Sequence, residues 1–394
     1  MSYNDRVALY KQCEEIRGNP LIVYVTSIRP NLSAQMCIDS IPSIIEQIEQ
    51  IPSDKKSVDL LIISNGGDPI ASLRIISMLR ERFEKISVLV PYVAYSAATV
   101  LALGADEIVM HPYSNLGPVD PQLTISRQNE IGQPSQLNFG SEDIRNYIDF
   151  IKKDVGITDQ SHLITAFNAL SKEVGPLPIG SAKRSQQLSL SLSEKMLETH
   201  MDDKNKACSI AKLLNSSYYH HGYAVSRGEA KDIGLNVIYP EKPLEELMWK
   251  IWQDFNYEMR CSSDFNPTTE IMNDPEAKRI INNVPIVSLP ANTPPDVAHS
   301  IIVTLAQQNA KVVQQPPIEI TQLMAVIESA NRAYEVRTIL SIAYWRETNM
   351  QLSVNVTGYS NGWQTVKAAI GKYIYIDPET GNEVTTMGVI GDTI

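Results

Sequence analysis

The sequence predicts an α/β protein built around a mainly parallel sheet, and two features of residues 20–110 indicate this class. Short apolar runs typical of strands alternate with amphipathic runs typical of helices. The strand-like runs are apolar at every position rather than at every second one, as expected of strands that helices cover on both faces. The first half of the chain is therefore expected to hold a buried sheet between helices.

The expected elements follow one another with short connections. Residues 33–50 carry isoleucines at spacings of three and four, so a helix is expected there despite Pro42. Residues 131–138 are polar and are expected to form a loop or lid. The full set comprises strands at 21–25, 59–64, 86–93 and 107–110 and helices at 33–50, 70–83, 97–104, 141–155, 158–174 and 193–214.

The composition changes beyond Pro240, and the remainder is expected to form a separate region. Residues 264–295 are rich in Pro, Asn and Asp, and a second proline pair stands at 316–317. We predict a first domain at 1–264, a Pro-rich linker at 265–319 and a smaller α+β region of unknown role at 320–394. A helix is expected at 320–345, with strands at 352–356 and 373–376.

Composition and charge exclude several classes of protein. The 394 residues are 43% hydrophobic with a net charge of −11, and Lys and Arg form no run longer than a pair, so nucleic acid is not an expected partner. The four cysteines form no CxxC motif, and no stretch of about 18 apolar residues occurs. A cytoplasmic protein without a membrane span is expected. The spacing of His, Cys and acidic residues predicts no metal, and no cofactor is expected.

A serine stands where an apolar strand is expected to give way to a helix. Ser96 follows the expected strand at 86–93 and directly precedes the helix expected from Ala97. The free N–H groups at the start of a helix stabilise an oxyanion, so a serine here suits nucleophilic chemistry. The alternative is that Ser96 only caps the helix.

A second turn, SNGGDP at residues 64–69, follows the preceding strand. Its glycine pair permits positive φ angles and leaves a backbone N–H facing open space. Because neighbouring parallel strands end at the same edge of a sheet, this pair and Ser96 are expected to meet there.

These motifs, in this order, resemble the Clp peptidase and signal peptide peptidase superfamily, whose fold is a crotonase-like spiral of ββα units. The closest resemblance is to the serine dehydrogenase proteinase family. It is carried by YSAATVLALGADEI (95–108), GPVDPQ (117–122) and HHGYAVSRGEAKDIGLNV (220–237) and covers roughly residues 20–240. The resemblance implies a ClpP/crotonase-like fold with a helical arm at 141–214.

The resemblance also implies the roles of residues in the two turns. Ser96 corresponds to the nucleophile, and the N–H groups of Gly67 and Ala97 correspond to the oxyanion hole. Substrates of the superfamily add as a strand beside the glycine turn, which would align Asn65, Gly66 and Asp68 with the bound polypeptide.

Three interpretations of the general base remain open. The order of residues in the serine dehydrogenase proteinase family corresponds to Ser96, Asp120 and His221, with the imidazole between the other two groups. The signal peptide peptidase order corresponds instead to Lys183, which would need desolvation to act as a base. His111, at the exit of the strand at 107–110, ranks last because a His-Pro pair there is commonly structural. His221 and Lys183 could equally be surface residues.

The first hypothesis is a soluble serine endopeptidase that cleaves polypeptides through an acyl-enzyme on Ser96. The resemblance implies a homo-oligomer in which one subunit's arm completes its neighbour's site. No nucleotide-binding motif is present, so an ATP-dependent unfoldase or other regulator would be a separate chain. The alternative is a crotonase-like scaffold that binds without hydrolysis. An acyl-CoA enzyme ranks third, because it would not need this nucleophile.

Overall fold

A mixed sheet organises the molecule in the computed structural model, which describes residues 3–128, 134–216, 222–282, 289, 292–309, 316–346, 352–366, 370–376 and 383–389. Nine strands of the described chain form this sheet, in the order β10-β5-β3-β2-β1-β11-β12-β13, with β14 paired to β12. Its parallel half consists of β1 (Leu21–Thr26), β2 (Ser57–Ile63), β3 (Lys85–Val90), β5 (Glu107–Met110) and β10 (Val237–Ile238). The α/β class and the expected parallel sheet are confirmed.

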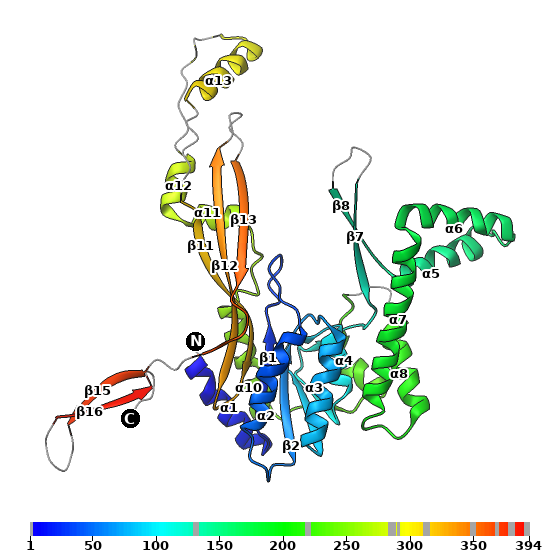
Figure 1. Ribbon diagram of the computed structural model, residues 1–394, viewed down its shortest axis with the longest axis vertical. Helices are drawn as coiled ribbons and strands as arrows, with labels where there is room; N and C mark the ends of the chain where they lie inside the picture. Colours follow the sequence, from blue (N-terminus) through cyan, green and yellow to red (C-terminus); the bar gives the residue numbers. More distant parts are fainter. Residues whose placement is uncertain are drawn as a thin grey trace.

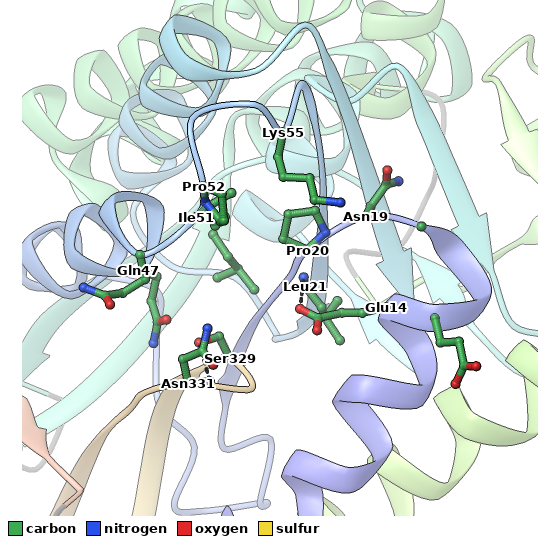
Figure 2. A pocket seen from close by; sticks show the side chains of 14 residues that line it. Glu14, Asn19, Pro20, Leu21, Gln47, Ile51, Pro52, Lys55, Ser329 and Asn331 are labelled. Atoms are coloured by element: carbon green, nitrogen blue, oxygen red, sulfur yellow. Dashed lines mark hydrogen bonds between the residues drawn. The ribbon is translucent and has the colours of Figure 1, made fainter.

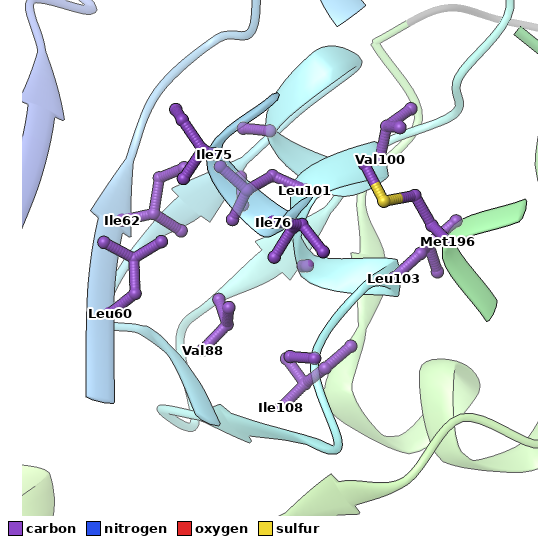
Figure 3. Close-up of a cluster of buried hydrophobic side chains, with 14 of the residues drawn as sticks. Leu60, Ile62, Ile75, Ile76, Val88, Val100, Leu101, Leu103, Ile108 and Met196 are labelled. Atoms are coloured by element: carbon purple, nitrogen blue, oxygen red, sulfur yellow. The ribbon is translucent and has the colours of Figure 1, made fainter. Parts of the chain in front are cut away.

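Helices cover both faces of the parallel strands, which explains their continuously apolar sequences. One face packs against α2 (Ile41–Glu49), α3 (Pro69–Arg82), α4 (Ala97–Leu103), α7 (Pro176–Leu197) and α8 (Lys204–Ser216). Figure 3 shows side chains of α3, α4 and α7 gathered over Leu60, Val88 and Ile108 of the sheet. The other face packs against α1 (Tyr3–Arg17) and α10 (Lys242–Glu258).

A second, three-stranded sheet lies beside the carboxyl edge of the parallel strands. It comprises β4 (Val93–Ala94), β6 (Asn115–Leu116) and β9 (Val225–Ser226), and α9 (Arg227–Asp232) follows directly. Together with the main sheet, it gives the alternation of long strand, short strand and helix that characterises a ClpP/crotonase-like spiral. The predicted fold class is confirmed.

Separate parts of the chain extend away from the sheet in different directions (Figure 1). The first, which we call the arm, begins with the hairpin of β7 (Gln122–Gln128) and β8 (Pro134–Gly140) and continues through α5 (Ser141–Asp149), a π-helical turn (Phe150–Asp154), α6 (Gln160–Val174) and α7. Helices α11 (Pro267–Asn273) and α12 (Pro275–Asn282) pack against residues 340–344 of the main sheet, and α13 (Pro295–Asn309) lies beyond them at the top of the view. The hairpin of β15 (Ile370–Ile376) and β16 (Glu383–Val389) lies apart from these helices, at the lower left.

The expected helix at 320–345 is wrong. These residues form an antiparallel hairpin of β11 (Ile318–Glu328) and β12 (Ala333–Arg346), which β13 (Leu352–Ser360) and β14 (Gln364–Thr365) extend. Strand β11 pairs with β1, so the last part of the chain continues the main sheet and does not fold apart from it. A turn at 329–332 divides the segment, and many of its residues are β-branched, which favours strands.

Three other expected boundaries differ from the structure. Residues 33–36 are not helical, and α2 begins at Ile41 with Pro42 in its first turn, where proline is favoured. Residues 134–138 belong to strand β8 rather than to a loop, while 129–133 lie outside the described residues. The expected linker at 265–319 contains helices α11, α12 and α13.

Candidate active site

Ser96 occupies a tight junction between β4 and α4. Its φ of 51° and ψ of −117° are unusual for a residue with a side chain, and they turn the chain sharply from strand into helix. Ser96 occupies the N-cap position of α4, but its side chain makes no capping hydrogen bond to the helix. The half-buried Ser96 side chain is therefore available for contact with a bound molecule.

The glycine turn lies directly against Ser96, as predicted. Gly66 and Gly67 have φ angles of 98° and 147°, which side chains rarely adopt. A Cβ added to Gly66 would lie 2.6 Å from the carbonyl oxygen of Tyr95 and 2.8 Å from the Cβ of Ser96. The two turns are in such close contact that only glycine fits at position 66.

Backbone hydrogen bonds from Ser64 hold the two turns together. Ser64 N–H donates to Val93 O at 3.1 Å, and Tyr95 N–H donates to Ser64 O at 2.9 Å. The Ser64 hydroxyl accepts from Gly66 N–H at 3.0 Å and contacts the Thr26 hydroxyl at 2.7 Å. The spacing between the glycine turn and Ser96 therefore depends on the short strand β4.

The N–H groups of Gly67 and Ala97 are left as donors at this junction. Met36 bonds on either side of Gly67, donating to Gly66 O at 2.8 Å and accepting from Asp68 N–H at 2.8 Å. In a parallel bridge this pattern turns the N–H of Gly67 away from Met36. Ala97 is the first residue of α4, where an N–H has no partner in its own helix. Neither N–H donates a hydrogen bond within the described chain.

A groove of about 500 Å³ opens over Ser96 and contains all of the predicted binding residues. Asn65, Gly66, Gly67 and Asp68 line it on one side, and Asp68 also caps α3 through a bond from Ile70 N–H at 2.8 Å. The remaining lining residues are Ser33, Ala34, Gln35, Pro69, Ser96, Ala97, Val100, Val119, Pro121, Gln122, Leu123, Ser185, Leu188 and Ser189. No lysine or histidine occurs in this lining, which is drawn from the described residues.

Asp120 lies at the rim of the groove, between the lining residues Val119 and Pro121. Its carboxylate accepts a hydrogen bond from Gln122 Nε2 at 2.9 Å. The loop that leads to Asp120 is bound to α4 by Thr99, whose hydroxyl donates to Gly117 O at 3.0 Å. His221, the predicted partner of Asp120, lies outside the described residues.

Lys183 is not brought to Ser96 within the described chain. Ser185, two residues further along α7, lines the groove. Successive residues of a helix are rotated by roughly 100°, so side chains two positions apart lie on nearly opposite sides of the helix. Lys183 is exposed on the other side of α7 and lines a different cavity.

His111 belongs to an aromatic cluster on the far face of the sheet. Its ring stacks on Trp249 of α10 with centroids 4.9 Å apart, and its Nδ1 accepts from Tyr113 N–H at 3.1 Å. Burial lowers the pKa of His111 below its usual value. The ring packs on the α10 side of the sheet, whereas α4 packs on the opposite side, and His111 is not among the residues that line the groove over Ser96.

The sequence did not identify several residues that shape the groove. Ser185, Leu188 and Ser189 come from α7, far along the chain, and no local motif marks them. Residues 33–35 were missed because they had been included in a helix. The proline at 42 was the signal that the helix starts later.

Another cavity, of about 400 Å³, lies at the amino-terminal end of β1 and thus at the opposite edge of the parallel sheet (Figure 2). Glu14, Gln47 and Ser329 are among its lining residues, and it is separate from the groove. Within the described residues, no cluster of His, Cys and acidic side chains could hold a metal ion. The helices described there are all too short or too polar to cross a bilayer.

The strand order and the paired turns resemble those of ClpP-like domains. Residues 31–137 match the family described as ClpP-like SDH-type serine proteinase, which confirms the resemblance predicted from the sequence. The matched segment includes both turns.

Two uncharacterized proteins of Methanocaldococcus jannaschii are relatives in sequence. MJ1495 is 26% identical over 59% of this chain and 71% of its own length. MJ0137 is 28% identical over 51% of this chain and 59% of its own length, so the alignment leaves much of that relative uncovered.

Solved structures of peptidases resemble the chain at low identity. A variant of the membrane-bound stomatin-specific protease 1510-N has a TM-score of 0.35 at 14% identity, covering 58% of this chain and 84% of that one. ClpP1 from Listeria monocytogenes has a TM-score of 0.31 at 13% identity, covering 60% and 97%. TM-scores and sequence identities this low give no information about the substrate or activity of this chain.

Proposed function

We propose that the protein is a serine endopeptidase that cleaves polypeptides through an acyl-enzyme on Ser96. The observation that carries the proposal is the junction of the two turns. The half-buried Ser96 hydroxyl does not cap its helix, and the N–H groups of Gly67 and Ala97 have no other partner within the described chain.

The chemistry follows from the arrangement of these groups. A base removes the proton from Ser96 Oγ as the oxygen attacks the carbonyl carbon of the substrate. The negative charge that develops on the carbonyl oxygen accepts hydrogen bonds from Gly67 and Ala97. The amine leaves with a proton from the base, and water then hydrolyses the ester by the same steps in reverse order.

For the base, we propose His221 acting with Asp120. Asp120 lies at the rim of the Ser96 groove. Lys183 lines a separate cavity, and His111 stacks on Trp249 of α10. A histidine held by a carboxylate is the base that such a serine commonly uses. Lys183 could serve as the base only from a neighbouring subunit.

For the substrate, we propose an extended segment of polypeptide lying beside the glycine turn. Asn65 and Asp68 line one side of the groove, and Gln122 and Leu123 at the start of strand β7 line another. An extended chain between them could pair with backbone groups of both sides. Val100, Val119 and Leu188 provide apolar contacts for a side chain next to the cleaved bond.

We also propose that the protein works as a homo-oligomer, with any unfoldase supplied as a separate chain. Large apolar side chains are exposed along the arm, including Phe150, Ile164, Phe167 and Leu177, which is 83% exposed. Exposed apolar groups in such number favour contact with another chain. Sedimentation of the full chain would measure the assembly.

Labelling by a fluorescent fluorophosphonate tests the nucleophile directly. Wild type is expected to label, and Ser96→Ala to lose all labelling. Ser185→Ala is the matched control, because this serine lines the same groove and should leave labelling unchanged. Labelling that survives in Ser96→Ala would disprove the proposed nucleophile.

The same assay identifies the base. His221→Ala is expected to reduce the labelling rate by about 100- to 10,000-fold, the range that a positioned general base contributes, and Asp120→Asn by somewhat less. Lys183→Ala should label like wild type. If Lys183→Ala abolishes labelling and His221→Ala does not, the assignment of the base is wrong. An intact oligomer that does not label at all favours the non-catalytic scaffold.

A further inference from the structure

The loop after β1, which we call the strap (residues 27–36), contacts the site in two ways. Residues 33–35 line the groove over Ser96. Met36 forms the parallel bridge to Gly67, and its two backbone bonds to the glycine turn orient the proposed oxyanion donor. A displacement of the strap would therefore change both the wall of the groove and the direction of the Gly67 N–H.

The backbone of the strap is mostly irregular. It consists of turns and coil, with the bridge at Met36 near its end. At its start, Ser27 N–H donates to Met324 O of β11 at 2.7 Å, and Ala34 N–H donates to Ser27 O at 2.8 Å. A segment of this kind keeps one conformation only through its contacts with the rest of the chain.

Arg29 makes several of these contacts from the middle of the strap. Its side chain is fully buried, and its partners all lie far along the chain. Nε donates to Ser263 O at 3.0 Å, Nη1 to Gln322 Oε1 at 2.8 Å and Nη2 to Glu270 Oε1 at 3.0 Å. Because a guanidinium is planar and its donors point in fixed directions, these bonds fix the strap relative to three other positions at once.

The residues next to Arg29 contact the same distant segment. Phe265 N–H donates to Pro30 O at 2.9 Å, and Asn31 Nδ2 donates to Phe265 O at 3.3 Å. Leu32 packs against the apolar cluster that α11 shares with β12. The segment 263–271, which leads into α11, is therefore bound to the strap along several consecutive residues.

We propose that Arg29 is a positioning residue for the site at Ser96, through which residues 263–271 hold the groove wall and the glycine turn in place. The inference rests on the proposed peptidase function. The positioning has two steps, because Arg29 fixes the strap and Met36 of the strap fixes Gly67. Without this anchor the Gly67 N–H leaves the direction in which it stabilises the developing charge.

Hydrogen–deuterium exchange and fluorophosphonate labelling of the full chain test the proposal together. Arg29→Lys keeps the charge but replaces the planar fork of donors by one ammonium group. Exchange in peptides that span residues 33–37 and 64–70 is expected to be about tenfold faster than in wild type, because the bonds between strap and turn weaken. The labelling rate is expected to fall about 10- to 100-fold.

Arg17→Lys is the matched control. Arg17 donates to Asp59 at 2.7 Å and to Glu107 at 2.7 Å, at the amino-terminal ends of β2 and β5 and thus at the opposite edge of the parallel strands. The same substitution there removes comparable bonds without touching the strap. Arg17→Lys should therefore match wild type in exchange of the strap and turn and in labelling rate.

Glu270→Gln is a second, milder variant, which keeps the shape of the side chain but removes the charge opposite Arg29. A smaller acceleration of exchange is expected at the same two segments. Melting temperatures show which variants are folded. If Arg29→Lys does not fold, Glu270→Gln decides the outcome.

Faster exchange confined to the strap and the glycine turn, together with slower labelling, supports the proposal. Unchanged exchange at both segments would overturn it, and so would equal acceleration in Arg17→Lys. Faster exchange with labelling at the wild-type rate would also overturn it, since the site would not depend on the strap. A wild type that does not label contradicts the peptidase function instead, and the exchange rates still decide whether Arg29 holds the glycine turn.

Discussion

At the scale of single residues, the site depends on backbone angles that side chains rarely adopt. Gly66, Gly67 and Ser96 all have positive φ, and Gly66 lies in contact with Ser96 across the junction of the two turns. Such strain persists only where the surrounding structure enforces it, and it clusters at functional sites. Here the bonds of Ser64 and Met36 enforce it.

Gly67→Ala is expected to inactivate the site while the protein stays folded. The new Cβ would lie 2.3 Å from Met36 O, so the turn must shift and its N–H must leave the oxyanion position. The loss of one oxyanion donor lowers rates on the order of 100-fold or more, measurable as the rate of fluorophosphonate labelling. Gly180→Ala is the control, since nothing lies within 4 Å of the added atom. Equal labelling rates in the two variants would contradict this role for Gly67.

Glu107, the first residue of β5, makes the stability of the fold depend on pH. Burial alone would raise its pKa, but hydrogen bonds from Arg17, Lys85 and Ser87 outweigh burial and lower the pKa to about 2. Because the folded pKa lies below the ordinary value of 4.5, the charged group stabilises the fold above about pH 4.5, and this contribution is lost as the pH falls toward 2.

We therefore expect Glu107→Gln to flatten the acid side of the stability profile. The free energy of unfolding, measured in urea between pH 6 and pH 3, should fall less in the variant than in wild type. The variant should also be less stable than wild type at pH 6, where the carboxylate is charged and paired. Parallel profiles would mean that Glu107 contributes nothing to acid unfolding.

At the scale of elements, a buried ion cluster connects helices α1 and α10 to strand β11. Arg6 of α1 contacts Asp254 of α10 at 2.8 Å and Glu328 of β11 at 2.7 Å. Tyr10 also donates to Glu328 at 2.6 Å. Arg6, Asp254 and Glu328 are nearly inaccessible, so each charge depends on the others for its solvation.

Arg6→Leu is expected to destabilise the protein by about 3–5 kcal/mol, because it leaves two buried carboxylates without their cation. Arg332→Leu is the matched control. Arg332 pairs with Glu46 at 2.9 Å, but both side chains are more than a third exposed, so about 1 kcal/mol or less should be lost. Denaturant unfolding measures both. Similar losses of unfolding free energy in the two variants would show that the buried Arg6 cluster contributes no more to stability than an exposed ion pair.

At the scale of the whole molecule, strands from both ends of the sequence form one sheet. Strand β11 covers the edge of β1, with Val25 paired to Val326, and β12 and β13 continue outward. Arg29, buried next to β1, donates to Gln322 of β11 at 2.8 Å. The predicted first domain, 1–264, therefore lacks β11, the strand that covers the second edge of β1.

A chain truncated after Asp264 is expected to aggregate. It would expose the edge of β1 and leave Arg6 and Arg29 without partners in β11. A chain ending at Val366 is the control, since it keeps β14 and loses only the separate hairpin of β15 and β16. Light scattering of the two purified chains measures the difference. A soluble, monodisperse chain of residues 1–264 would contradict this prediction and support the domain division read from the sequence.

The local pattern of the sequence determined the parallel sheet and the junction at Ser96. Continuous apolar runs indicate strands buried on both faces, and glycine at 66 and 67 indicates turns with positive φ, because these are properties of a few adjacent residues. The contact of the two turns followed from the rule that parallel strands end at one edge.

Only the tertiary structure decided what faces the groove and what closes the sheet. Ser185 and Lys183 are two residues apart, yet they line different cavities, because the side of α7 that meets the groove depends on packing. The hairpin at 318–346 was read as a helix because its pairing with β1 joins residues about 300 positions apart. Interactions at such sequence separation leave no mark in local periodicity, so the chain must be folded before they can be seen.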